Sequence, residues 1–163
     1  MKGFPVRDMT RCAFFAAAMA VCAWTGIPLG DTVFTLQTLG VFLALGLLGG
    51  KWGTVSIVCY LLLGAVGVPV FSGFRGGVGA LLGPTGGYLW GFLCTGLCYW
   101  AAEKVGKLPA MVLGQLVCYG CGVFWYTVYA GGGGIWLILP YLLPDAAKLL
   151  LAWLLTKRLK KRM

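Results

Sequence analysis

Six long apolar segments, separated by glycines, prolines and short basic clusters, divide the chain. A helix of about 20 apolar residues crosses a bilayer, and several of these segments approach that length. The first is too long for the apolar core of a signal peptide and is not followed by a small-residue cleavage site. The pattern therefore predicts an all-α membrane protein with one transmembrane domain over residues 1–163 and six helices, at about 9–29, 33–48, 52–68, 84–102, 108–129 and 144–156.

The last helix has the least certain start, because Pro140 and Pro144 interrupt its apolar run. Proline is best tolerated in the first turn of a helix, which favours a start near Pro144. Residues 135–143 are then expected to form a connection at the membrane surface, or one that dips into the protein.

Composition agrees with a membrane protein, since 60% of the residues are hydrophobic and 10% are charged, and the mean hydropathy is +0.91. An ordinary soluble domain has about 25% charged residues. The net charge of +9 raises nucleic acid as a partner, but the cations lie in short clusters beside apolar runs. The positive-inside rule explains such clusters, so we expect the lipid bilayer and no nucleic acid as a partner.

The distribution of cations predicts the orientation in the membrane. With six helices, both termini and two connections lie on one side, which receives eleven of the thirteen Lys and Arg residues; Arg75 lies on the other side and Lys148 within the last helix. Both termini are therefore predicted to be cytoplasmic. The seven cysteines all fall in apolar segments, and the chain has no histidine. They are interpreted as packing residues, and no metal or cofactor is expected.

Asp145 and Lys148 are the most informative polar residues, because ionisable groups within a span are costly and usually face a cavity or one another. Their spacing of three residues places both on one helix face. They could form an ion pair that merely locks the helix, or offer an acceptor and a cation to a ligand that carries N–H donors and a carboxylate.

Other polar and aromatic residues are predicted to lie at the same depth, near the outer surface. They are Gln37, Tyr88, Trp125 and Tyr126, with Arg75 in a glycine-rich outer loop over residues 69–83. Such a group resembles the wall of a small-molecule pocket. The aromatic residues could equally form an interfacial belt, and Arg75 could simply be solvated.

The first helix carries two pairs of small residues four positions apart, Ala13 with Ala17 and Ala16 with Ala20. Such pairs let another helix approach closely, either within the chain or from a separate subunit. An enzyme is not expected, because the chain has no histidine and no GxSxG motif, and the sequence at 46–51 is one residue short of an ATP-binding Walker A motif.

Several ordered motifs together resemble the BioY family, the biotin-binding membrane subunit (S-component) of energy-coupling factor (ECF) transporters. They are IPLG at 27–30, TLQT at 35–38, GVPVF at 67–71, LLGPTGGYL at 81–89 and LPYLLPDAAK at 139–148. The resemblance implies a multi-pass, six-helix subunit of the bacterial cell membrane without ATPase activity. It would join a transmembrane coupling subunit (EcfT) and ATP-binding-cassette ATPase subunits to take up biotin.

The resemblance also implies roles for particular residues. Asp145 and Lys148 would contact biotin, and Ala13, Ala16, Ala17 and Ala20 would form the surface that docks on the coupling subunit. Asp145 could accept a ureido N–H while Lys148, alone or with Arg75, neutralises the carboxylate; the opposite orientation of the ligand stays open. An S-component for another vitamin, or a purely structural helical subunit, are the alternatives.

Overall fold

The computed structural model describes residues 6–29, 32–132, 136 and 138–161. These residues form a helical bundle with one short β-hairpin, in the order α1 Val6–Trp24, β1 Ile27–Leu29, β2 Thr32–Phe34, α2 Gln37–Leu48, α3 Gly50–Ala65, the 3-10 turn η1 Ser72–Phe74, α4 Val78–Leu82, α5 Gly86–Ala102, α6 Lys107–Ala130 and α7 Leu139–Lys160. Lys2 and Arg162, which are among the cations counted for the orientation, lie outside the described residues.

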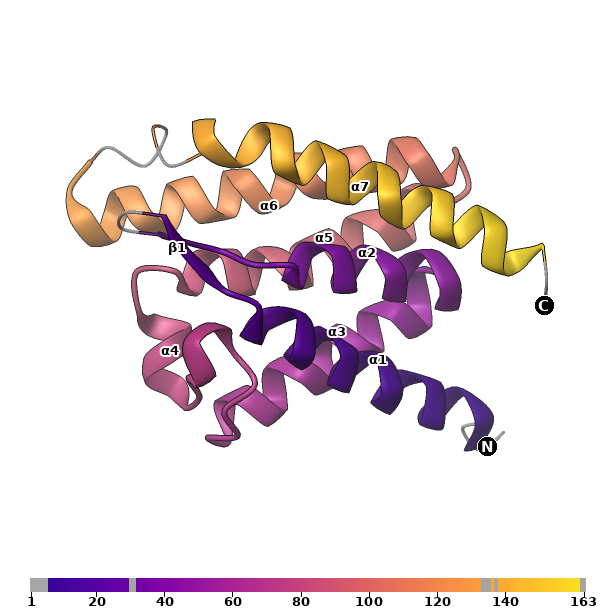
Figure 1. Ribbon diagram of the computed structural model, residues 1–163, viewed down its shortest axis with the longest axis horizontal. Coiled ribbons are helices and arrows are strands. Elements are labelled where there is room, and N and C mark those ends of the chain that lie inside the picture. The colour runs from indigo at the N-terminus through magenta and orange to yellow at the C-terminus, as the bar shows by residue number, and fades with distance from the viewer. Residues whose placement is uncertain (1–5, 30–31, 133–135, 137, 162–163) are drawn as a thin grey trace.

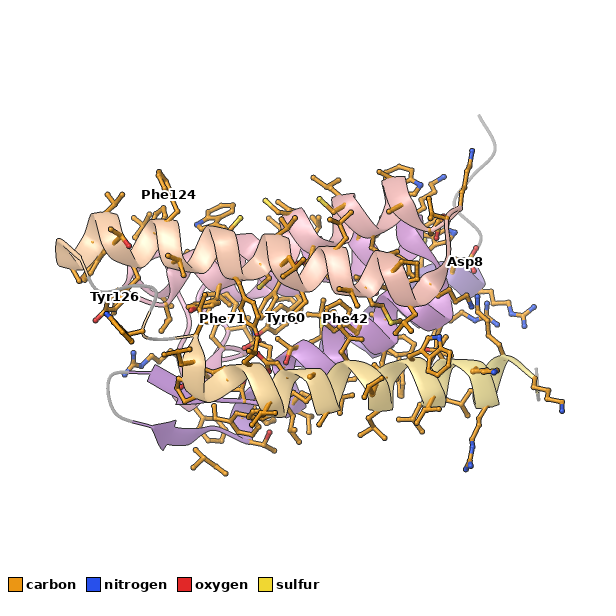
Figure 2. The ribbon with its side chains drawn as sticks, turned by 90° about the horizontal axis from the view of Figure 1, so that it is seen from above. Asp8, Phe42, Tyr60, Phe71, Phe124 and Tyr126 are labelled. Atoms are coloured by element: carbon orange, nitrogen blue, oxygen red, sulfur yellow. The ribbon has the colours of Figure 1, made fainter. Side chains whose placement is uncertain are left out.

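The longer helices run side by side along the length of the molecule (Figure 1). Helix α1 begins and α7 ends at one end of the bundle, here called the basic end, whereas the hairpin, η1 and α4 lie at the other, here called the hairpin end. Helix α5 packs along α6, and α2 packs against α1, α3 and α7. Seen from above, α6 and α7 run on either side of the buried side chains of Phe42, Tyr60 and Phe71 (Figure 2).

The first two predicted helices are wrong at the boundary between them. Helix α1 ends at Trp24, and Ile27 pairs with Phe34 in an antiparallel hairpin instead of continuing a helix. The β-branched and aromatic residues of Thr32–Phe34 favour extended backbone, and Pro28 is tolerated in a two-stranded ribbon whose outer edges are unpaired. The second helix therefore begins at Gln37, four residues after the predicted start.

The predicted start of the last helix at Pro144 is also wrong, since α7 begins at Leu139 and contains Pro144. The N–H groups of Tyr141 and Leu142 both donate to the carbonyl of Ile138, at 2.9 and 3.1 Å, and so form the first turn. Pro144 has no N–H and leaves one carbonyl of that turn without its usual partner, which membrane helices tolerate. The predicted connection is therefore helical over residues 139–143, while 135 and 137 lie outside the described residues.

The predicted outer loop over residues 69–83 contains η1 and α4, and it is fixed to the end of α1. The indole Nε1 of Trp24 donates to the carbonyl of Pro69 at 2.8 Å. The ring of Trp24 also stacks on Phe74, with centroids 5.1 Å apart and planes at 23°. Phe74 has a φ of 57°, which is uncommon for a residue other than glycine, so the surrounding contacts hold the turn in this conformation.

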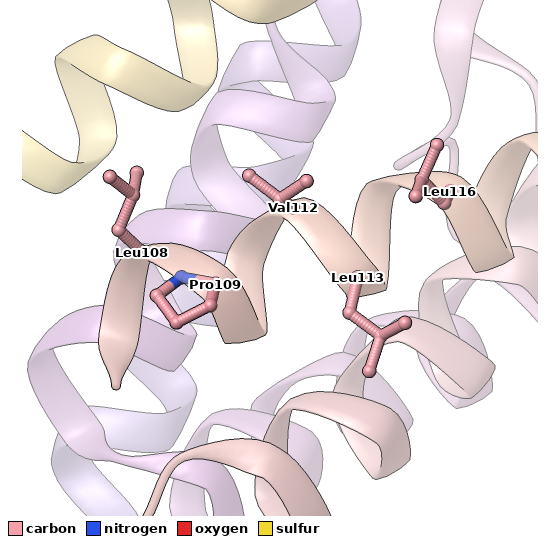
Figure 3. A pocket seen from close by; sticks show the side chains of 5 residues that line it. All are labelled: Leu108, Pro109, Val112, Leu113 and Leu116. Atoms are coloured by element: carbon pink, nitrogen blue, oxygen red, sulfur yellow. The ribbon is translucent and has the colours of Figure 1, made fainter. Parts of the chain in front are cut away.

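The exterior of the bundle is apolar, with large exposed hydrophobic side chains on α1, α3, α5, α6 and α7. A shallow groove of about 450 Å³ on α6 is lined by Leu108, Pro109, Val112, Leu113 and Leu116 (Figure 3). By length and composition, α6 and α7 could each cross a membrane, whereas α2 and α3 have 12 and 16 residues. A 12-residue helix is about 18 Å long, less than the ~30 Å hydrocarbon core of a bilayer.

Candidate ligand-binding site

Asp145 and Lys148 form a buried ion pair in the first half of α7. The Lys148 Nζ lies 2.7 Å from the Asp145 Oδ1, and each residue is 6% exposed. The structure therefore brings the two side chains together, as their spacing predicts. Burying two charges is costly unless further hydrogen bonds satisfy them, so the neighbouring polar groups decide what the pair can do.

The carboxylate of Asp145 collects donors from three helices. Its Oδ1 accepts from Lys148 and, at 3.4 Å, from the Thr38 hydroxyl of α2. Its Oδ2 accepts from the Tyr119 hydroxyl at 2.8 Å and from the Gln115 Nε2 at 3.3 Å, both on α6. A carboxylate offers about four lone-pair positions. Each oxygen of Asp145 thus has two donors, and the carboxylate joins α2, α6 and α7.

The ammonium of Lys148 retains one donor that is weakly engaged. Of its three N–H groups, one donates to Asp145 and one to the carbonyl of Thr35, at 2.6 Å. The Nζ also lies 3.8 Å from the centre of the Phe34 ring, which in turn stacks on Tyr141. A cation–π contact is weaker than a hydrogen bond to a charged group, so a ligand oxygen could replace it.

Gln37 is buried as a polar residue but does not join the pair. Its Nε2 donates to the Tyr60 hydroxyl at 2.7 Å, and that hydroxyl donates to the carbonyl of Val70 at 2.9 Å. Gln37 therefore connects α2 to α3 and to the loop that leads to η1. Its contribution to the site is to hold the chain next to Thr35 and Thr38.

The predicted aromatic residues lie toward the hairpin end, on α5 and α6. Gln115, Tyr119, Gly122 and Tyr126 recur at intervals of four, three and four residues and so share one face of α6. Tyr126 lies near the hairpin end of this face (Figure 2). The ring of Tyr88 packs against Gly122, because a side chain added at Gly122 would collide with it.

Trp125 and Arg75 do not belong to this shared face of α6. The indole Nε1 of Trp125 donates to the carbonyl of Gly83 at 2.9 Å, which ties α6 to the connection between α4 and α5. Arg75 is exposed, and its carbonyl accepts from the N–H of Phe71 at 2.9 Å. Among the described residues, the hydrogen-bond and ion-pair partners of Asp145 and Lys148 do not include either of them.

The four alanines of α1 divide into two pairs. Ala16 and Ala20 are 2% and 5% exposed and belong to the core of the chain. Ala13 and Ala17 are exposed and lie beside this pair on the helix surface. Only the second pair is therefore free to meet another molecule, and the first serves packing within the bundle.

Sequence reasoning missed five contributors to the site: Phe34, Thr35, Thr38, Gln115 and Tyr119. Gln115 could have been found, because it is one of two glutamines in the chain and stands within an apolar span. A buried amide without a partner is costly, so a glutamine in an apolar span indicates a polar partner or ligand, as a charged residue does. The role of Thr35 depends on its backbone carbonyl, for which the sequence carries no signal.

The contact between Tyr88 and Gly122 predicts an effect on stability. Gly122→Ala is expected to lower the unfolding temperature of the purified protein, because the added Cβ collides with a ring in a packed interior and such overpacking costs about 1–3 kcal/mol. Gly120→Ala is the matched control on the same helix, since nothing lies within 4 Å of its added Cβ. An equal unfolding temperature for the two variants would contradict the packing described here.

Comparison with known proteins places the chain in a family. The sequence profile of the BioY family matches residues 1–163. The biotin transporter BioY of Thermotoga maritima is 40% identical over 167 aligned positions, covering 96% of this chain and 97% of that protein. The probable biotin transporter BioY of Pyrococcus horikoshii is 36% identical, covering 94% and 96%.

A solved structure agrees with these relatives. The S-component for biotin from an ECF-type ABC transporter matches with a TM-score of 0.86 at 29% identity, covering 96% of this chain and 92% of that one. The relatives are transporter components and not enzymes, and transporters reside in membranes, which fits the apolar exterior. The chain is a member of the BioY family, as its motifs indicate.

Proposed function

We propose that the protein binds biotin and serves as the substrate-specific subunit of an ECF-type transporter in the bacterial cell membrane. Family membership and the likeness to a biotin S-component support the substrate. The observation that carries the proposal is the buried pair of Asp145 and Lys148. It supplies a charged, hydrogen-bonded centre inside an apolar bundle, where a polar ligand can be recognised after it leaves water.

The chemistry of biotin suits this centre. Its cyclic urea presents two N–H donors and a carbonyl, its sulfur ring is apolar, and its side chain ends in a carboxylate. Lys148 offers its weakly engaged N–H to a ligand oxygen, and Arg75, exposed on the loop near the hairpin end, can meet a carboxylate. Tyr126 lies on the shared face of α6, Tyr88 packs against Gly122 of that face, and Trp125 donates to Gly83 just before α5.

The proposed topology has six membrane crossings and cytoplasmic termini. It is supported by the shared position of the start of α1 and the end of α7 (Figure 1). Cations of the described chain gather on the helix ends there, among them Arg7, Arg11, Lys51, Lys107, Lys157 and Arg158. The positive-inside rule assigns this basic end to the cytoplasm and the hairpin end, with the binding site nearer to it, to the outside.

The proposed partners are a transmembrane coupling subunit and two ATP-binding-cassette ATPases, which would supply the energy of transport. The exposed pair of Ala13 and Ala17 provides a surface on α1 that a second helix can approach closely. No cofactor is proposed, and biotin is the only ligand.

Calorimetric titration of the detergent-purified chain tests the function. We expect saturable binding of one biotin per chain and no heat of binding with thiamine or riboflavin under the same conditions. Binding of another vitamin in place of biotin would contradict the proposed substrate but would still be consistent with the S-component fold.

A further inference from the structure

Gln115 carries a buried oxygen that has no partner in the described part of the chain. The residue is 7% exposed, and its Oε1 accepts no hydrogen bond, while its Nε2 donates to Asp145. A buried acceptor without a donor destabilises a protein. Such an oxygen is therefore a candidate to accept a hydrogen bond from a group outside the chain, such as a ligand.

The orientation of this amide is fixed by chemistry. The ionised oxygen of Asp145 accepts hydrogen bonds and cannot donate them, so the nitrogen of the amide must face it. The Oε1 of Gln115 therefore points away from the carboxylate. Turning the amide over would place two acceptors against each other and lose the bond to Asp145.

The neighbouring donors are already committed. The single hydroxyl protons of Tyr119 and Thr38 are given to the two oxygens of Asp145. Lys148 gives one N–H to Asp145 and one to Thr35, and the third faces the ring of Phe34. The carboxylate of Asp145, in turn, has two donors on each oxygen. Within the described residues of this cluster, the buried side-chain oxygen without a hydrogen-bond partner is thus the Oε1 of Gln115, whereas both carboxylate oxygens are occupied.

We infer that the side-chain carbonyl of Gln115 accepts a hydrogen bond from one of the two ureido N–H groups of biotin; this rests on the function proposed above. Biotin carries no other N–H donor, so the contact places the ureido ring, and not the carboxylate, against α6 and α7. The third N–H of Lys148 then meets the ureido carbonyl in place of the Phe34 ring. Asp145 acts as a positioning residue that orients Gln115 and Lys148.

Two analogues of biotin test this contact in the unmodified protein. In each, one ureido N–H is replaced by an oxygen, which gives a cyclic carbamate of nearly the same shape. One of the two is expected to bind roughly 10- to 100-fold more weakly than biotin, because it turns a lone pair toward the Oε1 of Gln115. Equal affinities for biotin and both carbamates in calorimetric titration would overturn the inference.

A substitution tests whether Gln115 is the residue that distinguishes biotin from the carbamate. In Gln115→Met, which keeps the side-chain length but removes the amide, biotin is expected to bind roughly 10- to 100-fold more weakly and the preference over the carbamate to fall within about threefold. Desthiobiotin keeps both N–H groups but lacks the sulfur ring. The ratio of its affinity to that of biotin should therefore be the same in Gln115→Met as in the unmodified protein. A carbamate preference as large as in the unmodified protein would overturn the inference.

Tyr119→Phe is the matched control, because it also removes one donor from the Oδ2 of Asp145 but leaves the Gln115 amide in place. The carbamate preference should persist in this variant even if overall affinity falls. Its loss in both variants would assign the effect to Asp145 and overturn the role of Gln115. Failure of the unmodified chain to bind biotin would reject the proposed function, and this inference with it.

Discussion

Lys148→Met is expected to abolish measurable biotin binding and to lower the unfolding temperature of the purified protein. The substitution removes the cation that lies 2.7 Å from Asp145 and leaves a carboxylate buried at 6% exposure without its counter-charge. Breaking a buried pair on one side costs about 3–5 kcal/mol. Calorimetric titration and thermal unfolding in detergent measure the two effects separately.

The double variant Asp145→Asn/Lys148→Met separates binding from folding. Removing both charges should restore most of the unfolding temperature, because no uncompensated charge stays buried. Biotin binding should remain lost, since the donor to the ligand is absent. If Lys148→Met bound biotin with unchanged affinity, the pair would be a structural lock of α7 and no part of the binding site.

Ala17→Leu is expected to abolish biotin uptake by cells that express the complete transporter, while biotin binding by the purified chain stays unchanged. Ala17 is exposed on α1, so a leucine there does not disturb the packing of the chain itself. The larger side chain does, however, prevent the close approach of a second helix to this surface. Uptake of labelled biotin and calorimetric titration provide the two measurements.

Two other alanines serve as controls for this result. Ala101→Leu adds the same bulk at an exposed position of α5 and should leave uptake intact. Ala16→Leu adds it at a position of 2% exposure and should lower the unfolding temperature, because the core has no space for it. Uptake at the normal rate with Ala17→Leu would show that the exposed alanine pair is not a docking surface.

The sequence was most informative where a feature depends on spacing within one helix. Asp145 and Lys148 share a face of α7 because three residues make nearly one turn, and the structure pairs them. The alanine pairs of α1 are visible for the same reason. Which pair faces solvent depends on how α1 packs against α2 and α3, and the sequence of α1 does not contain that information.

Element boundaries were less predictable, because apolar content does not distinguish a helix from a short hairpin. Residues 27–29 and 33–34 are apolar enough to extend the neighbouring helices, yet the strands Ile27–Leu29 and Thr32–Phe34 pair with each other. Pro144 suggested a helix start, but the first turn formed at Ile138 lies before it and the bundle tolerates the missing hydrogen bond. The preference of Thr32–Phe34 for extended backbone outweighed apolar content at the hairpin, whereas α7 continues through Pro144 despite the preference of proline for a first turn.

The candidate site combines groups that no single motif contains. The TLQT string holds Thr35 and Thr38, which contact the pair, but Gln37 is the polar residue that stands out in the string and it contacts Tyr60 instead. Gln115 and Tyr119 come from α6, 26 or more residues before Asp145 in the chain. Such long-range hydrogen bonds follow from the arrangement of helices and become visible only in the fold.

A structure of the protein bound to biotin would show whether the pair of Asp145 and Lys148 belongs to the binding site. We expect a polar atom of biotin within about 3.2 Å of the Lys148 Nζ, with the bicyclic ring between α2, α6 and α7. This expectation would be contradicted by biotin bound elsewhere in the bundle while the contacts of Asp145 and Lys148 with Thr35, Thr38, Gln115 and Tyr119 stay as they are here.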